Sequence, residues 1–470
     1  MLVEIQFLGA TKEVTGSMTL LTTDSGLKIL IDCGFVQNGN PEEMLKINGR
    51  PFEFNASEID VVVASHGHSD HVSSIPLLVK RGFNGKIIAT QATADFMAIN
   101  LKDGVKIMKD DVYRITKVKP NAKLQPLYDE DDVENTLSLT RCYDFDTDIK
   151  LDDFTTIRLH RSGHMLGAAV VNISYKDGHK WKTIAFTGDT SGLRKDKPFL
   201  PQADKLGKID YLVCESTYGN RIHEKTNIIQ LFTNMIKETC INNGKALLIP
   251  SFALMRSSEI LWWLREVYIE NPEFNKIPIY LDSPMSIKAQ KVVDNNRVYW
   301  GEKWLERDNS LRSLFDWEVV QYIDDYKESQ ALNVKNPMII VTSSGMLTSG
   351  RVLMHLENVL KQKGCQIVLV GYQAENTLGR KLLETQHKSI SVNRRQVVIR
   401  AKVSQINLSS HADKFQLLEF IKTSRKGQLK KIFLNHGDIE ACESLKDEIE
   451  QHINGVQVLI PEWNEKFILK

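Results

Sequence analysis

Cysteine is scarce in this chain and follows no recognisable pattern. Six cysteines are scattered over 470 residues, no two of them form a Cys-x-x-Cys pair, and several lie in apolar runs typical of buried thiols. The sequence therefore predicts neither a disulfide framework nor a zinc site built from thiolates.

Long apolar runs are also missing. No stretch of 18 apolar residues occurs, and the chain begins directly as an alternating strand, Val3 to Leu8, without a charged leader or an apolar signal segment. We therefore expect a cytoplasmic protein with no membrane segment. Internal repeats and Pro- or Ser-rich linkers are absent too. Hydrophobic residues make up 42% of the chain, which is enough for the cores of several domains.

An excess of one charge is absent as well, because the formal net charge is only +1. Overall charge therefore cannot indicate a nucleic-acid partner. Locally the balance differs: residues 391–431 carry ten Lys or Arg against two acidic residues, whereas residues 125–153 carry ten acidic residues against two basic ones. We interpret the acidic stretch as a solvated surface, and the basic stretch as either a solvated surface or a track for phosphates.

The most informative segment is Ser65–His71, which reads Ser-His-Gly-His-Ser-Asp-His after the apolar run Val61–Ala64. It places three of the chain's 12 histidines and one aspartate within six positions. Residues two apart at a strand end project to the same side, and the following turn brings the last two ligands to a second position. One loop is therefore able to serve two metals about 3.5–4 Å apart, the usual apparatus for hydrolysing phosphate esters. The alternative is a histidine-rich surface loop.

Other polar residues end short strands in a similar way. Alone, an aspartate after a strand is often a turn former, and a histidine on an apolar strand is often a buried core residue. Together with the loop at 65–71 they predict one chemical site, because strand ends are where a rigid scaffold presents reactive groups. These residues are Asp32, His164, Asp189, His411 and His436, and Glu215 follows the apolar run Tyr211–Cys214.

The expected elements change along the chain. Short strands dominate the first 100 residues and the stretch from 156 to 187, and strands and helices return beyond residue 397. Residues 227–390 alternate helices with short apolar strands, which predicts a separate parallel α/β domain. Residues 105–153 are polar and irregular, and we expect an insertion there rather than part of a core.

Further motifs make the sequence recognisable. In order and context, Asp32, the loop 66–71, His164 and Asp189 match the four ligand motifs of the metallo-β-lactamase superfamily. Downstream, the chain resembles the β-CASP nucleases of that superfamily over nearly its whole length. The supporting segments are Glu215–Gly219, Pro250–Ala253, Asp282–Met285, Thr342–Met346, Gly371–Gly379, Ser409–Asp413 and Asn435–Asp438.

This resemblance implies an α/β fold: an αββα metallo-β-lactamase sandwich with an inserted parallel α/β β-CASP domain. The first part of the sandwich is expected at 1–215, with the acidic insertion at about 105–153, the β-CASP domain at 216–390, and the second part of the sandwich at 391–470. The N-terminal KH modules of archaeal relatives and the C-terminal domain of the ribonuclease J enzymes are not expected.

The resemblance also implies two zinc ions per chain, although manganese is chemically reasonable. His160 is not an expected ligand, because the Ser-Gly-His context belongs to His164, four residues later. Asp32 would orient a ligand without touching a metal. Carried over by position, His66, His68 and His164 would hold the first zinc, Asp70, His71 and His436 the second, and Asp189 would bridge both.

The implied reaction is hydrolysis of a phosphodiester bond by a hydroxide that the two metals activate. His411 would give a proton to the leaving 3′ oxygen, and Glu215 would keep this imidazole protonated through its opposite charge. Ser409 resembles a family serine that contacts a phosphate oxygen. The turn Ser343–Gly345, with Ser344 at its centre, has backbone N–H groups able to face a phosphate.

Histidine at the last motif, His436, favours RNA over DNA, because the DNA-repair members of the family usually have valine there. Without an appended domain, we expect an endonuclease of the compact bacterial type that acts on single-stranded RNA. A homodimer is compatible with the sequence.

Three alternative functions stay open. The same site could degrade RNA from the 5′ end as a 5′–3′ exoribonuclease. A metal hydrolase of a small-molecule ester or phosphodiester would explain the ligands but leave the inserted domain and the pair of Glu215 and His411 without a purpose. A catalytically silent RNA-binding subunit is the third, although every expected ligand is present.

Overall fold

The computed structural model describes residues 2–311, 317–374, 376–385, 388–425 and 427–470. Glu375 of the 371–379 motif and Lys426 of the basic stretch lie outside these described residues. The chain forms two compact units. The first comprises Met1–Asp196, Leu200–Ile222 and Ser410–Lys470, and the second comprises Lys197–Phe199 and His223–Ser409. No helix in the described ranges is long and apolar enough to cross a membrane.

Two seven-stranded sheets form the centre of the first unit. In spatial order the first sheet contains β22 (Lys466–Ile468), β1 (Glu4–Phe7), β2 (Thr19–Thr22), β3 (Lys28–Ile31), β4 (Val61–Val63), β5 (Lys86–Ala89) and β6 (Thr140–Cys142). The second contains β21 (Gln457–Leu459), β20 (Lys431–Asn435), β11 (Tyr211–Glu215), β10 (Lys180–Phe186), β9 (Ala169–Asp177), β8 (Thr155–Arg161) and β7 (Ile149–Lys150).

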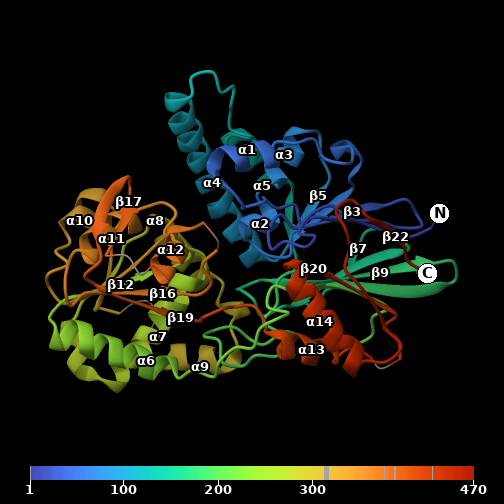
Figure 1. Cartoon of the computed structure of the whole chain (residues 1–470). Helices are drawn as coiled ribbons and strands as arrows, with labels where there is room; N and C mark the ends of the chain where they lie inside the picture. Colours follow the sequence, from blue (N-terminus) through green and yellow to red (C-terminus); the bar gives the residue numbers. More distant parts are fainter. Residues whose placement is uncertain (1, 312–316, 375, 386–387, 426) are drawn as a thin grey trace. The chain divides into compact units, whose positions relative to one another are not determined.

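The two sheets of this unit share one core, and helices cover their outer faces (Figure 1). Side chains alternate along β4: Val61 and Val63 face the core between the sheets, and Val62 faces the helices. The helices are α1 (Pro41–Asn48), α3 (Ile75–Lys80), α4 (Gln91–Val118) and α5 (Glu130–Leu139) on the first sheet, and α13 (Lys414–Ile421) and α14 (Ile439–His452) on the second. The expected αββα sandwich is confirmed.

The expectation that residues 105–153 are irregular and lie outside the core is wrong, whereas their being an insertion stays a prediction. This stretch holds the second half of α4, all of α5, and the edge strands β6 and β7, which pair with β5 and β8. Tyr128, Val133 and Ile149 are buried in the cores. The acidic run was misleading because Asp129 caps α5, and acidic residues in a first helical turn are favoured by the helix dipole.

The second unit is built on a six-stranded sheet in which all neighbouring strands are parallel. In spatial order its strands are β14 (Val320–Tyr322), β13 (Ile279–Leu281), β15 (Met338–Thr342), β12 (Ala246–Pro250), β16 (Gln366–Val370) and β19 (Lys402–Ile406). A separate hairpin pairs β17 (Ser389–Val392) with β18 (Arg395–Val398). The predicted parallel α/β architecture is confirmed.

Helices cover both faces of this parallel sheet. On one face lie α6 (Ile228–Ile236) and α7 (Arg256–Glu270), and on the other lie α11 (Val352–Leu360) and α12 (Leu378–Glu384). The unit also contains α8 (Pro284–Asn295), α9 (Glu302–Leu311) and α10 (Tyr326–Ala331).

The segment Lys197–Phe199 packs with the second unit, although the chain on either side of it belongs to the first. The ring of Phe199 is fully buried, with its centroid 5.6 Å from that of Trp262 and 5.3 Å from that of Trp300. The backbone N–H of Gly301 donates to the carbonyl of Phe199 at 2.8 Å. The domain limits expected from the sequence, 1–215, 216–390 and 391–470, stay predictions.

Candidate metal centre

The expected ligands follow the carboxyl ends of strands in the first unit. β4 leads into the loop 66–71, which contains the short helix α2 (Ser69–Val72), while β10 leads to Asp189 and β20 to His436. The loop closes tightly over the end of β3, because a Cβ at Gly34 would stand only 1.7 Å from the carbonyl oxygen of Asp70. Only glycine fits there.

A first group of ligand atoms comes from three histidines and Asp189. His66 Nε2 lies 3.0 Å from His68 Nδ1, and His164 Nε2 lies 3.3 Å from that same atom. Asp189 Oδ2 lies 3.4 Å from the Nε2 atoms of His66 and His164. Ligands about 2.0–2.1 Å from a tetrahedral zinc stand about 3.3–3.4 Å apart, so this set fits a zinc ion. Burial and neighbouring imidazoles lower the pKa of His68 to about 3, and the neutral imidazole is the form that binds metals.

A second group consists of Asp70, His71 and His436. The two Nε2 atoms of His71 and His436 lie 3.3 Å apart. Asp70 Oδ2 lies 3.4 Å from Nε2 of His436 and 3.9 Å from Nε2 of His71. One atom from each residue lies within 4.8 Å of the others, which is compact enough for a shared metal ion.

Asp189 faces both groups with different oxygens. Its Oδ2 faces the first group, and its Oδ1 lies 3.2 Å from Nε2 of His71 in the second. Oδ1 is buried, and no donor among the described residues forms a hydrogen bond with it. Burial acts to raise the pKa of Asp189, but the surrounding imidazoles, His436 and His71 first, hold it well below its usual range. A buried, ionised oxygen without a donor is costly unless a cation is nearby, so the residues fit a dinuclear site.

Asp32 and Ser65 contact the imidazoles of His71 and His66 at Nδ1, the ring nitrogen that faces away from the centre. Asp32 Oδ2 lies 2.7 Å from His71 Nδ1, and the Asp32 carboxylate also accepts from the backbone N–H of Ser65 at 2.7 Å and from its hydroxyl at 2.8 Å. Ser65 Oγ in turn lies 3.1 Å from His66 Nδ1. Contacts at Nδ1 leave the Nε2 atoms of both rings facing the centre.

Glu215 and His411 form a pair beside the first group. Both carboxylate oxygens of Glu215 lie within 3.0 Å of His411 Nδ1, and the backbone N–H of Thr190 donates to Glu215 Oε1 at 2.6 Å. Nε2 of His411 lies 3.7 Å from Asp189 Oδ2. Burial lowers the pKa of His411, but Glu215 and Asp189 outweigh burial and raise it to about 9.

Comparison with known proteins identifies the family. Three family models match the chain: the metallo-β-lactamase superfamily at residues 11–212, the β-CASP domain at 258–382, and the Zn-dependent metallo-hydrolase RNA specificity domain at 396–461. A ribonuclease of Thermus thermophilus is 31% identical over 444 residues, which cover 93% of this chain and 94% of the relative. The chain belongs to the β-CASP ribonucleases of the metallo-β-lactamase superfamily.

A second relative agrees with this assignment, and a solved structure agrees with the fold. A probable RNase of Methanocaldococcus jannaschii is 30% identical over 467 residues, which cover 98% of this chain and 99% of the relative. A crystal structure of an Enterococcus faecalis protein of unknown function aligns with a TM-score of 0.56 and 11% identity over the whole of both chains, and supports the fold alone. The predicted family and the class of metal-dependent hydrolase are confirmed.

Two expected phosphate-binding residues of this β-CASP chain, Ser344 and Ser409, belong to the second unit. Ser344 Oγ accepts from the backbone N–H of Thr348 at 2.9 Å, so this hydroxyl stabilises its own turn. The backbone N–H of Ser409 donates to Asn407 Oδ1 at 3.1 Å. Contact of either serine with a phosphate stays a prediction.

His160 lies in a separate group with two aspartates. Its Nδ1 is 2.6 Å from Asp146 Oδ1, and Arg161 Nη1 is 3.5 Å from carboxylate oxygens of both Asp146 and Asp204. The Arg161 guanidinium already offsets part of the charge of the two carboxylates, so the cluster around His160 is poorly suited to a cation.

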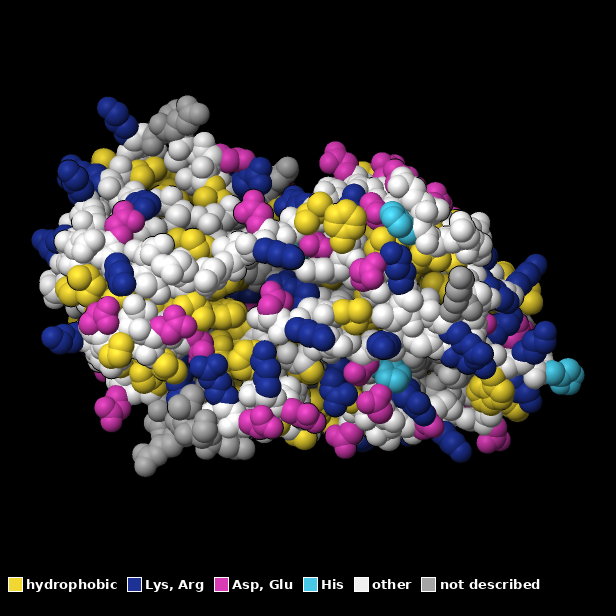
Figure 2. Space-filling view, turned by 90° about the horizontal axis from the view of Figure 1, so that it is seen from below, with side chains coloured by type: hydrophobic (Ala, Val, Ile, Leu, Met, Phe, Trp, Pro, Cys, Tyr) yellow, Lys and Arg dark blue, Asp and Glu magenta, His cyan; other side chains and the backbone are white. Residues whose placement is uncertain are grey.

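The basic stretch 391–431 is partly neutralised. Lys402 Nζ lies 2.6 Å from Glu238 Oε2, and Lys422 Nζ lies 2.8 Å from Glu419 Oε1. On the face drawn in Figure 2, Lys and Arg side chains are interspersed with Asp and Glu rather than gathered in a patch of one sign. Both interpretations of the stretch, a solvated surface and a track for phosphates, stay open.

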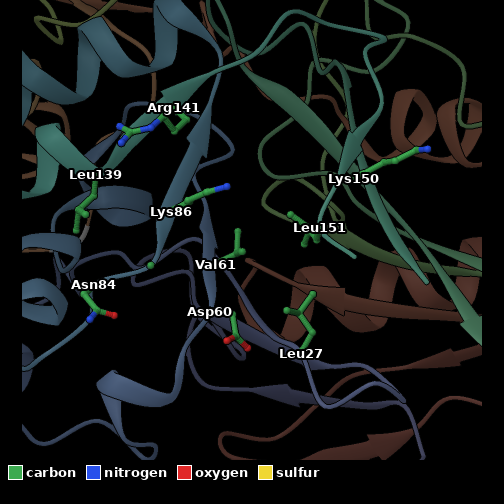
Figure 3. A pocket seen from close by; sticks show the side chains of 10 residues that line it. Leu27, Asp60, Val61, Asn84, Lys86, Leu139, Arg141, Lys150 and Leu151 are labelled. Atoms are coloured by element: carbon green, nitrogen blue, oxygen red, sulfur yellow. The ribbon is translucent and has the colours of Figure 1, made fainter. Parts of the chain in front are cut away.

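A hollow of about 370 Å³ in the first unit lies beside Val61 and Lys86, the first residues of β4 and β5. It is therefore at the end of β4 opposite to the one that leads into the loop 66–71. Its rim carries Arg141 and Lys150, whose charged groups point away from one another in Figure 3. The cations do not converge on one point, and none of the proposed ligands lines this hollow.

Sequence reasoning missed three groups that contact the expected site residues: the side chain of Ser65 at His66 Nδ1, the side chain of Thr217 at His436 Nδ1, and the backbone N–H of Thr190 at Glu215 Oε1. Ser65 and Thr217 lie inside the motifs at 65–71 and 215–219, beside residues with expected roles. Thr190 directly follows Asp189, and its hydroxyl also donates to the carbonyl of Ser162 at 2.8 Å, which ties the Asp189 loop to the loop that carries His164. Adjacency to a predicted ligand was the available signal.

Proposed function

We propose that this protein is a zinc-dependent ribonuclease that hydrolyses phosphodiester bonds within single-stranded RNA, with two zinc ions per chain. The observation that carries the proposal is the placement of Asp189, whose two oxygens face two separate groups of imidazoles. His66, His68 and His164 would hold the first zinc, Asp70, His71 and His436 the second, and Asp189 would contact both. When bound, a zinc pair supplies an activated water and neutralises charge on the phosphate.

His411 is assigned the role of general acid. Glu215 occupies its Nδ1, so Nε2 is the nitrogen left to face the centre and to give a proton to the leaving 3′ oxygen. The His411 side chain keeps 20% of its surface exposed, whereas Glu215 beneath it is fully buried, so only the imidazole is accessible to a substrate. Glu215 therefore acts through His411.

RNA is the proposed substrate for three reasons. The match to an RNA specificity domain covers residues 396–461, the relatives are named as ribonucleases, and the last motif carries His436 rather than valine. Ser409 and the turn at Ser344 are proposed to contact phosphates. Internal cleavage is proposed over 5′–3′ degradation, and a small-molecule ester is the competing substrate class.

The test is cleavage of a 5′-labelled single-stranded RNA and its DNA counterpart by zinc-loaded protein, with the products resolved by length and the His411→Ala variant run alongside. Internal RNA fragments that disappear in the variant are the expected result. Mononucleotides alone would indicate an exonuclease. An uncut RNA in the presence of two bound zinc ions would favour the small-molecule hydrolase.

A further inference from the structure

Thr217 lies beside His436, one of the proposed ligands of the second zinc. The strands β11 and β20 are parallel neighbours with Glu215 opposite Asn435, so the residues that follow them run side by side. The approach is close, because a Cβ at Gly437 would stand 2.6 Å from the carbonyl oxygen of Ser216. The register of the sheet therefore places Thr217 against His436.

The hydroxyl of Thr217 contacts His436 twice. Oγ1 donates to the carbonyl of His436 at 3.0 Å and lies 3.2 Å from its Nδ1. A hydroxyl has a single hydrogen to donate, so with that hydrogen on the carbonyl, the oxygen accepts from Nδ1–H. Asp189 Oδ1, at 3.5 Å from the same Nδ1, is too distant for a good hydrogen bond. With a metal bound, Nδ1 would then carry the ring proton, and Nε2, which lies 3.4 Å from Asp70 Oδ2 and 3.3 Å from His71 Nε2, would offer its lone pair to the metal.

The backbone of His436 is constrained in the same place. Its φ of +53° lies in the left-handed region, which residues with a side chain rarely adopt. Its N–H donates to the carbonyl of Ala10 at 2.8 Å, and its own carbonyl accepts from the N–H of Ser216 at 3.3 Å. Because Thr217 bonds both this carbonyl and the ring, it couples the orientation of the imidazole to the backbone.

The two histidines of the second group are thus supported differently. His71 has the carboxylate of Asp32 at its Nδ1, at 2.7 Å, whereas His436 has a neutral hydroxyl at 3.2 Å. We propose that Thr217 is a positioning residue for the second zinc, and that its hydroxyl fixes the tautomer and the direction of His436 so that Nε2 binds the metal. This inference rests on the proposed two-zinc function.

The test compares zinc affinity in three variants of the full chain. Thr217→Val removes the hydroxyl and keeps the branched shape, Thr217→Ser keeps the hydroxyl, and Thr183→Val is a matched control whose hydroxyl lies 2.9 Å from Ser174. Zinc content is measured while a chelator is titrated into the zinc-loaded protein. We expect Thr217→Val to weaken the second zinc about 10- to 100-fold and to leave the first unchanged. Thr217→Ser and Thr183→Val should retain both affinities.

The outcomes separate this inference from the function on which it rests. Two zinc ions in the wild type with unchanged affinities in Thr217→Val would overturn the role of Thr217 alone. Equal weakening of both sites in Thr217→Val would overturn it too, since the hydroxyl would then support the fold rather than one ligand. Fewer than two zinc ions in the wild type would instead overturn the proposed two-zinc function.

Discussion

Both carboxylate oxygens of Glu215 contact one ring nitrogen of His411, Nδ1, at 3.0 and 2.9 Å. The opposite nitrogen, Nε2, lies 3.7 Å from Asp189 Oδ2. The pair therefore separates two tasks: Glu215 holds the imidazole, and the imidazole alone points toward the proposed ligands. We therefore expect that His411, the proposed proton donor, can be replaced without changing any of the proposed metal ligands.

The His411→Ala variant should keep both zinc ions and lose turnover. We expect kcat for RNA cleavage to fall about 10²- to 10⁴-fold, the usual range for a lost general acid. Single-turnover cleavage with the zinc content measured on the same sample checks this. His160→Ala is the matched control, since His160 lies in a separate group, and it should cleave at the wild-type rate. Retained turnover in His411→Ala would remove the general-acid assignment.

The Asp189→Ala variant should lose metal and activity together. Both groups of imidazoles contact this one carboxylate, at 3.4 Å in the first and 3.2 Å in the second, so neither site keeps its full ligand set. We expect fewer than two bound zinc ions by elemental analysis and cleavage at the level of the buffer. A variant that still binds two zinc ions tightly would rule out a bridging role for Asp189.

Asp32→Asn should weaken zinc binding without abolishing it. The amide keeps the shape but removes the charge that supports His71 Nδ1 at 2.7 Å. Loss of such a partner typically lowers metal affinity about 10- to 100-fold. Chelator competition measures the change, and an affinity equal to that of the wild type would argue that Asp32 only maintains the turn at Ser65.

Reversing the charges of Arg394 and Arg395 tests the basic stretch. Both side chains are exposed: Arg394 lies in the turn between β17 and β18, and Arg395 is the first residue of β18. If each contacts one phosphate of single-stranded RNA, the slope of log affinity against log salt should flatten by about 1.4 in the double variant Arg394→Glu, Arg395→Glu. Lys180→Glu, at an exposed site on β10, serves as the control. An unchanged slope in the double variant would return the stretch to a solvated surface.

Removing zinc should lower the stability of the first unit and leave that of the second unchanged. All the proposed ligands belong to the first unit, and a metal that binds only the folded state stabilises that state. Hydrogen exchange should therefore accelerate after chelation in β4 and the loop 66–71. The buried strands β12 and β15 of the second unit provide an internal reference. Equal acceleration in both units would indicate that the metal supports the whole chain.

Much of the site could be predicted because its signals are local. An apolar run followed at once by His66, His68 and His71 marks a strand end that presents ligands, and the later strand-end residues add to it. The stretch 105–153 was misread because four consecutive acidic residues resemble a solvated loop, whereas Asp129 and its neighbours begin a helix. Ser65 and Thr217 were missed because a hydroxyl that supports a ligand has no sequence pattern of its own.

The buried ring of Phe199 has a consequence for any attempt to take the protein apart. Phe199 lies between Asp196 and Leu200 in the sequence, but its ring packs against Trp262 and Trp300 of the second unit. A fragment comprising residues 223–409 alone would therefore contain a cavity where the Phe199 ring belongs. A truncation of that kind has the energetic character of deleting a large core side chain, which typically costs about 3–5 kcal/mol. A fusion of the second unit to another protein must therefore include a side chain that fills the position of Phe199.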